Sequence, residues 1–213
     1  MSTVVDLLLV CALLLNFLML GSSRLRSVIQ CAALQGLLLG ILLVLVHHDA
    51  GWRVMALGLV TILLKTVLIP WMLVRALREV GIRREVEPLV SFVMSLVLGA
   101  LGTGLAIIFA GTLPLAPEHA TTLIVPASLA TVLTGFLVLT TRRKAITQVV
   151  GYLTLENGVF LFGLTLVEAM PFLVEIGVLL DLVVAIFVMG IVIDHINREF
   201  SSINTENLST LRD

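Results

Sequence analysis

Long apolar runs separated by short polar breaks are the dominant pattern of this 213-residue chain. A helix needs about 20 mostly apolar residues to cross the hydrocarbon core of a bilayer. The chain has seven runs of roughly this length: Val4–Leu20, Val28–Val46, Val54–Val74, Leu89–Gly111, Leu123–Thr141, Ile146–Val167 and Phe172–Ile193. The pattern therefore predicts an all-α integral membrane protein with about seven transmembrane helices.

The breaks between the runs carry basic residues in alternation. Eleven of the thirteen Lys and Arg residues fall in every second loop or in the C-terminal tail, Arg53 lies in one of the other loops, and Lys65 lies inside a run. Cytoplasmic loops of membrane proteins hold an excess of Lys and Arg. The alternation thus predicts an N-terminus outside and a C-terminus in the cytoplasm.

The runs divide the chain into four parts. We expect a three-helix unit with a cytoplasmic loop at 1–88, a fourth helix and outer loop at 89–121, a second three-helix unit at 122–196, and a polar cytoplasmic tail at 197–213. Residues 26–30 can be laid on 144–148, which suggests an internal duplication. The alternative is that basic loops followed by apolar helices resemble each other by composition alone.

The composition excludes several classes of protein. The chain is 59% hydrophobic and 13% charged, which is too apolar for an ordinary soluble domain, and its net charge of −1 gives no sign of a nucleic-acid partner. The first run lacks a basic leader and a small-residue cleavage site, so we expect a retained helix. Cys11 and Cys31 lie in apolar runs, which is typical of small buried side chains and not of a disulfide or metal pair.

Three runs carry an ionisable residue near the midpoint: Lys65, Glu156 and Asp181. A charge at the bilayer centre costs about 2.5–3.5 kcal/mol on insertion scales, and such residues often mark ion or proton pathways. Since the three fall at about one depth, the pattern predicts a proton relay. Glu175 lies six residues before Asp181 and on another face of the helix, where it either lines an outer approach or reaches toward the interface.

The neighbours of these residues add two expectations. Gly151 and Gly158 flank Glu156 and would let another helix approach closely. Lys65 should have a carboxylate partner, from this chain or from another subunit. Pro70 would free a backbone carbonyl about one turn back, close to Lys65.

The remaining polar positions favour structural roles. Asn16, Gln30 and Gln35 are typical of interhelical hydrogen-bond partners, and Gly99, Gly102 and Gly104 suggest close packing of the fourth span. The segment 47–49 (His-His-Asp) lacks a third ligand run, which disfavours a metal site. The sequence has no nucleotide loop, haem motif or iron–sulfur cysteine cluster, so we expect no catalytic residue and no cofactor in this chain.

Segment 142–158, RRKAITQVVGYLTLENG, resembles the second span of K-type subunits of NADH–quinone oxidoreductase. In that family a basic loop leads into a helix with a glycine, a buried glutamate and an asparagine. The family glutamate corresponds to Leu153 here; Glu156 follows three residues later on the same face. Asp181 is the nearest counterpart of the second family glutamate. The tail at 203–212 also resembles that family, so the resemblance covers about the last 80 residues.

The full layout, with segments 61–70, 155–158 and 174–181, is similar to hydrogenase-4 component E. This resemblance implies a non-catalytic, multi-pass subunit of the inner membrane in a formate hydrogenlyase-type, proton-translocating complex. Its implied partners are membrane lipid, antiporter-like membrane subunits and a peripheral hydrogenase-like module with [NiFe] and iron–sulfur clusters. The alternatives are a subunit of a multisubunit cation/proton antiporter and a structural scaffold whose buried charges only fix helix packing.

Overall fold

The computed structural model describes residues 2–46, 52–80, 88–113, 123–165 and 190. These residues form helices and short connections, with no β-strand among them. The helices are α1 (Ser2–Gly21), α2 (Leu25–Val46), α3 (Trp52–Ile62), the π-helix η1 (Leu63–Leu68), α4 (Ile69–Val80), α5 (Phe92–Ala110), α6 (Ile124–Thr141) and α7 (Ala145–Gly163).

Six helical stretches in the described part of the chain are long and apolar enough to cross a membrane. They are Thr3–Gly21, Leu25–Val46, Gly58–Arg78, Phe92–Ala110, Ile124–Thr141 and Ala145–Gly163. They overlap the first six predicted runs, which confirms these helices within the described residues and supports a multi-pass membrane protein. Three predicted parts lie outside the described residues: the seventh run except for Gly190, the segment at 47–49, and the tail at 197–213. The seventh span and the orientation therefore stay predictions.

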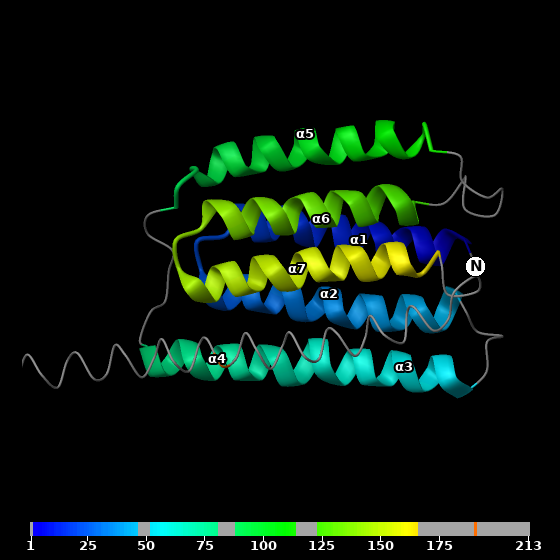
Figure 1. The fold of residues 1–213 in the computed structure, drawn as a ribbon, viewed down its shortest axis with the longest axis horizontal. Helices are drawn as coiled ribbons and strands as arrows, with labels where there is room; N and C mark the ends of the chain where they lie inside the picture. The colour runs from blue at the N-terminus through cyan, green and yellow to red at the C-terminus, as the bar shows by residue number, and fades with distance from the viewer. Residues whose placement is uncertain (1, 47–51, 81–87, 114–122, 166–189, 191–213) are drawn as a thin grey trace, which may run out of the picture.

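The helices lie side by side along the long axis of the molecule (Figure 1). The central four are α1, α2, α6 and α7: α1 contacts α2 and α6, while α7 contacts α6 and α2. Helix α5 packs on α6 and α1, and the run α3–η1–α4 packs on α2. The four central helices therefore lie between α5 on one side and the run α3–η1–α4 on the other.

The interior has a polar layer between two apolar clusters. One cluster is formed by Val5 and Leu9 of α1, Leu39, Leu42 and Leu43 of α2, Ile124 and Ala127 of α6, and Phe160, Leu161 and Leu164 of α7. The other is formed by Met19 and Leu20 of α1, Leu25, Val28, Ile29, Cys31 and Ala32 of α2, Val138 of α6, Ile146, Val150 and Leu153 of α7, and Leu73 and Leu77 of α4. The buried polar side chains between them on the four central helices are Asn16, Gln35, Ser128, Thr131, Thr134, Thr154, Glu156 and Asn157. Each is therefore held at mid-height by apolar packing above and below.

Glycines set the closest helix contact in the bundle. A Cβ added at Gly135 of α6 would collide with the backbone of Leu155, and one at Gly151 of α7 would lie 2.6 Å from the amide nitrogen of Leu139. A Cβ at Gly158 would lie 2.5 Å from the amide nitrogen of Val132. Such small residues let helix backbones approach in a membrane. The close approach of α7 to α6 fixes the register of Glu156.

Candidate functional site

The helix that carries Lys65 widens into a π-helix at that residue. Helices α3 and α4 are joined without a break by η1, in which the amide of Ile69 donates to the carbonyl of Leu64, five residues back. Pro70 has no N–H, and its ring would clash with the carbonyl of Thr66 in a regular α-helix. The π pairing relieves this clash. Short π segments are frequent at functional sites of helices.

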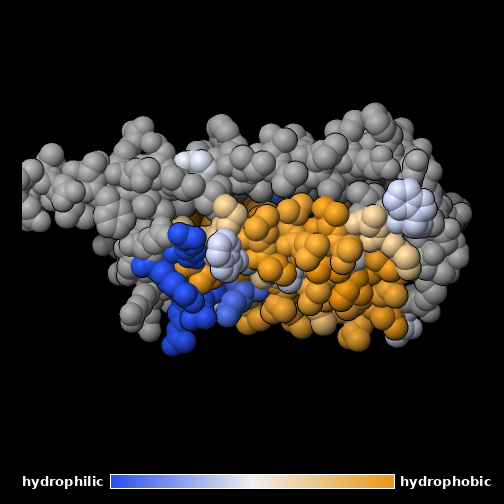
Figure 2. Space-filling model, turned by 90° about the horizontal axis from the view of Figure 1, so that it is seen from below, coloured by the Kyte–Doolittle hydropathy of each residue, from blue (hydrophilic) through white to orange (hydrophobic). Residues whose placement is uncertain are grey.

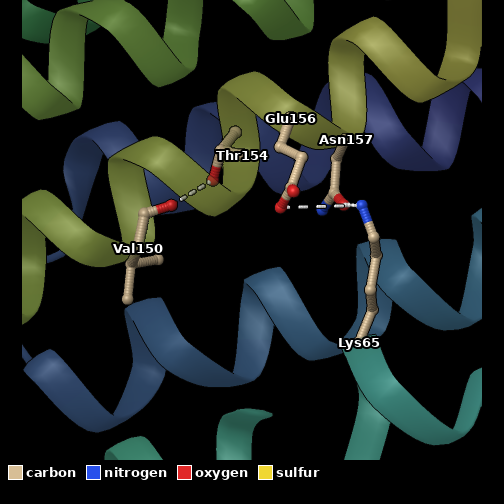
Figure 3. Close-up of polar contacts among 5 residues, drawn as sticks. All are labelled: Lys65, Val150, Thr154, Glu156 and Asn157. Carbon is tan, nitrogen blue, oxygen red and sulfur yellow. Dashed lines mark hydrogen bonds and ion pairs between the residues drawn. The ribbon is translucent and has the colours of Figure 1, made fainter. Parts of the chain in front are cut away.

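Lys65 extends from η1 to two side chains of α7 (Figure 3). Its Nζ lies 3.8 Å from Oε2 of Glu156 and donates to Oδ1 of Asn157 over 3.3 Å. The ammonium also lies 5.4 Å from the ring centroid of Phe160. The expected carboxylate partner therefore comes from this chain.

Three side chains of α7 lie around the ammonium. Glu156 and Phe160 are one turn apart on one face of the helix, and Asn157, three residues before Phe160, lies on the adjoining part of that face. Only 8% of Lys65, 7% of Glu156 and 3% of Asn157 is exposed. Thr154 does not join them, because its hydroxyl donates to the carbonyl of Val150 in its own helix (Figure 3).

The pair is costly to bury. Two opposite charges taken out of water carry a large desolvation cost, which their attraction offsets only where the geometry is close and further hydrogen bonds satisfy the remaining polar atoms. Asn157 provides one such hydrogen bond to the ammonium of Lys65.

Gly36 of α2 lets the π segment come this close. A Cβ at Gly36 would lie 2.7 Å from the Cβ of Lys65 and 3.0 Å from its carbonyl carbon. One turn further, a Cβ at Gly40 would lie 3.1 Å from the carbonyl oxygen of Gly58 and would collide with Ile62. Neither glycine was predicted to be part of the site. Their spacing of four residues on one face was the signal that identifies them.

A small cavity adjoins Lys65 and Asn157. It has a volume of about 10 Å³ and is lined by Ile29, Ala32, Lys65, Ile69, Pro70, Leu73, Leu153 and Asn157. The centre of a water molecule needs about this much space, roughly 10–15 Å³, and the water needs two or more polar partners. Lys65 and Asn157 are the polar residues of the lining, and Glu156 is not part of it, so the cavity has room for one water beside Lys65 and Asn157.

Asn16, Gln35 and Thr131 form a second polar cluster in the same layer. Gln35 donates to Oδ1 of Asn16 over 2.7 Å, and Asn16 donates to Oγ1 of Thr131 over 2.9 Å. This network joins α1, α2 and α6, which confirms the interhelical role predicted for Asn16 and Gln35. Gln30, predicted to act likewise, is instead exposed.

Two buried atoms near the pair have no hydrogen-bond partner within the described ranges: Oε1 of Gln35 and Oγ1 of Thr66. Gln35 precedes Gly36, and Thr66 follows Lys65. Buried polar atoms generally have a hydrogen-bond partner in the protein or in ordered water. Near Lys65, the polar layer therefore contains two polar atoms that could bind water.

Arg142 is a second buried cation, predicted from the sequence only as part of a basic loop. It is 2% exposed and donates to the carbonyl of Leu20 over 2.8 Å and to that of Val90 over 3.4 Å. Its guanidinium lies 4.5 Å from the ring centroid of Phe92. It therefore ties the ends of α1 and α5 to the connection between α6 and α7. Nothing in the sequence separates it from Arg143, which is exposed.

The other predicted relay residues are not placed. Asp181 and Glu175 lie outside the described residues. Lys65 and Glu156 are therefore the two members of the predicted relay that the structure brings together. Within the described ranges no group of three or more His, Cys, Asp or Glu side chains forms a metal site.

The fold and the site define a multi-pass helical membrane protein with a buried Lys–Glu pair at mid-height. The chain belongs to the family of the uncharacterized protein Rv0085 of Mycobacterium tuberculosis (strain ATCC 25618 / H37Rv). The two are 33% identical over 204 residues, which cover 94% of this chain and 92% of that protein.

A shorter similarity connects the chain to hydrogenase-4 component E of Escherichia coli (strain K12) and of Shigella flexneri. It is 34% identity over 80 residues, which cover 38% of this chain and 37% of each relative. No family model and no solved structure matches the chain. The predicted resemblance to component E is thus supported over part of the chain.

Proposed function

We propose that this protein is a non-catalytic membrane-arm subunit of a proton-translocating redox complex in the inner (cytoplasmic) membrane, and that Lys65 and Glu156 belong to its proton relay. The complex is of the group 4 [NiFe]-hydrogenase or formate hydrogenlyase type. The observation that carries the proposal is the buried ion pair, which joins two helices at mid-height. The partial similarity to hydrogenase-4 component E supports the type of complex.

The pair suits proton transfer along the plane of the membrane. One proton can pass between Lys65 and Glu156, and a water in the adjoining cavity would extend the path beyond direct hydrogen-bond reach. Asp181 would be the third carrier and Glu175 an outer approach. Antiporter-like subunits would receive the proton laterally, and a peripheral module with [NiFe] and iron–sulfur clusters would supply the driving reaction.

The structural alternative also has an observation in its favour. Asn157 and Phe160 hold the Lys65 ammonium together with Glu156, as they would in a site that only fixes helix packing. The two roles require different properties of the Glu156 side chain. A relay needs a group that gains and loses a proton, whereas a packing site needs only a hydrogen-bonding group of the same shape.

Glu156→Gln separates the two roles, because the amide keeps the shape and the hydrogen bonding but does not titrate. The tagged protein is purified with its complex, copurifying subunits are identified, and proton uptake is measured in proteoliposomes. We expect the complex to assemble, at a lower yield because the amide leaves the buried ammonium of Lys65 without its counter-ion, and to lose proton translocation. Asp6→Asn makes the same chemical change on α1, outside the polar layer, and should pump normally. Full pumping by an assembled Glu156→Gln complex would reject the relay role.

A further inference from the structure

The outer surface of the Lys65 helix carries an apolar groove. Its volume is about 500 Å³, and it is lined by Leu63, Leu64, Val67, Leu68 and Trp71. Leu63, Val67 and Trp71 are 53%, 57% and 59% exposed, whereas Lys65 on the inner side is 8% exposed. The groove therefore opens away from the bundle, along the π segment. Pockets of roughly 300–1,000 Å³ take molecules of small-ligand size.

Two arginines extend the groove at one end. Arg75 lies one turn beyond Trp71, with its guanidinium 5.9 Å from the Trp71 ring centroid, and Arg78 follows in the last turn of α4; both are exposed. The spacing of 64, 68, 71, 75 and 78 keeps these positions on one stripe of the helix. Figure 2 shows the apolar surface of this face giving way to hydrophilic residues at one end.

We propose that this stripe binds an anionic phospholipid, with an acyl chain in the groove and its phosphate at Arg75 and Arg78. Four of the five lining side chains are aliphatic and lie within a candidate span, where they suit an acyl chain and provide no hydrogen bond to a polar ligand: Leu63, Leu64, Val67 and Leu68. Guanidinium groups match phosphate geometry, and clustered basic residues at the end of a span attract anionic headgroups. Tryptophan at this position is typical of the level of the headgroups.

The groove and Lys65 lie on opposite sides of the same π segment. The apolar residues of the groove other than Trp71 are all part of η1, which widens around Lys65. A chain seated there packs directly against the outer side of the π segment. Lipid binding at this stripe is independent of the proposed proton relay.

The test uses the full-length protein, purified in detergent, stripped of lipid, and titrated with phosphatidylglycerol or phosphatidylcholine of the same acyl chains. Native mass spectrometry counts the lipids retained. We expect phosphatidylglycerol to be preferred, and the double variant Arg75→Gln/Arg78→Gln to reduce its affinity about tenfold or more while leaving phosphatidylcholine unchanged. Arg143→Gln, at another exposed basic position, should have no such effect.

A groove-filling variant tests the acyl chain. Val67→Trp should reduce retention of both lipids, whereas Leu101→Trp on the exposed face of α5 should not. Equal retention of both lipids by the wild type, or unchanged selectivity in the double arginine variant, would overturn the proposal. So would a photo-crosslinker at residue 67 that reacts in native membranes with a polypeptide and not with lipid. Since the wild-type selectivity and the crosslink need no substituted arginine, the test does not depend on every variant folding.

Discussion

At the residue scale, three side chains of α7 hold the buried ammonium of Lys65 in different ways. Glu156 supplies charge, Asn157 a hydrogen bond and Phe160 the face of its ring. Removing one member of a buried ion pair leaves the other charge uncompensated, which typically costs about 3–5 kcal/mol, whereas removing both is often nearly neutral. The pair should therefore be strongly non-additive in its effect on stability.

A double-mutant cycle of Lys65→Met and Glu156→Gln measures this coupling. We expect Lys65→Met alone to lower the free energy of unfolding, because it leaves Glu156 buried without its cation. The double variant should be less destabilised than the sum of the single variants, by roughly 1–3 kcal/mol. Reversible unfolding in detergent micelles gives the values. Additive effects would show that the two side chains are not coupled.

The sequence identified both members of the pair, because an ionisable group inside an apolar run is conspicuous. It did not identify the pairing. Ninety-two residues separate Lys65 from Asn157, and which groups meet depends on the register of three packed helices. Arg142 was missed for a related reason: its burial results from the ends of α1 and α5, which a local pattern does not contain.

At the element scale, the apolar runs predicted the helices well and their irregularities less well. The run Val54–Val74 lies within one continuous helix. Pro70 predicted a backbone carbonyl without its helical hydrogen bond near Lys65, but it did not predict a π segment. Gly104 was predicted to pack closely, which is wrong: a Cβ there would meet no atom within 4 Å. A glycine in an apolar run marks a contact only when a neighbouring backbone lies opposite it.

Gly36→Ala tests whether the approach of α2 positions Lys65. The added methyl group would lie 2.7 Å from the Cβ of Lys65 and would also crowd its backbone carbonyl group. Because these atoms cannot rotate away as the end of a side chain can, η1 must shift away from α2. Overpacking of this kind costs roughly 1–3 kcal/mol. We expect a lower unfolding temperature and, in the complex, reduced proton translocation.

Gly104→Ala is the matched control for that change, because it adds the same methyl group in open space on α5. Alanine is the better helix former by roughly 0.5–1 kcal/mol, so this variant should be as stable as the wild type or slightly more so. If both glycine variants behaved alike, the close contact at Gly36 would not be what holds Lys65 in place.

At the scale of the whole molecule, two similar hairpins form the centre. Connections 22–24 and 142–144 are both three residues long, α1 contacts α6, and α2 contacts α7. This is the arrangement that an internal duplication would give, and the duplication stays a prediction. The apolar clusters at either end enclose the polar layer, so the depth of Glu156 and Lys65 is a property of the bundle and not of one helix.

The number of spans decides where the C-terminus lies, and it is open to direct measurement. Six spans would leave both ends of the chain on one side of the membrane, whereas the predicted seventh run, Phe172–Ile193, places the C-terminus opposite the N-terminus. Single cysteines are introduced after residues 2, 50, 82, 116, 143 and 205 in a variant with Cys11→Ser and Cys31→Ala, and labelled with an impermeant maleimide in intact cells.

Because basic loops face the cytoplasm, we expect labelling after residues 2, 50 and 116 and protection after 82, 143 and 205. Permeabilised cells, in which all exposed sites react, provide the control. Labelling on opposite sides for sites 82 and 143 would reject the alternating topology itself. Labelling at site 205 in intact cells, with the other sites as expected, would leave six spans and remove Asp181 from the membrane interior, and with it the third carrier of the relay.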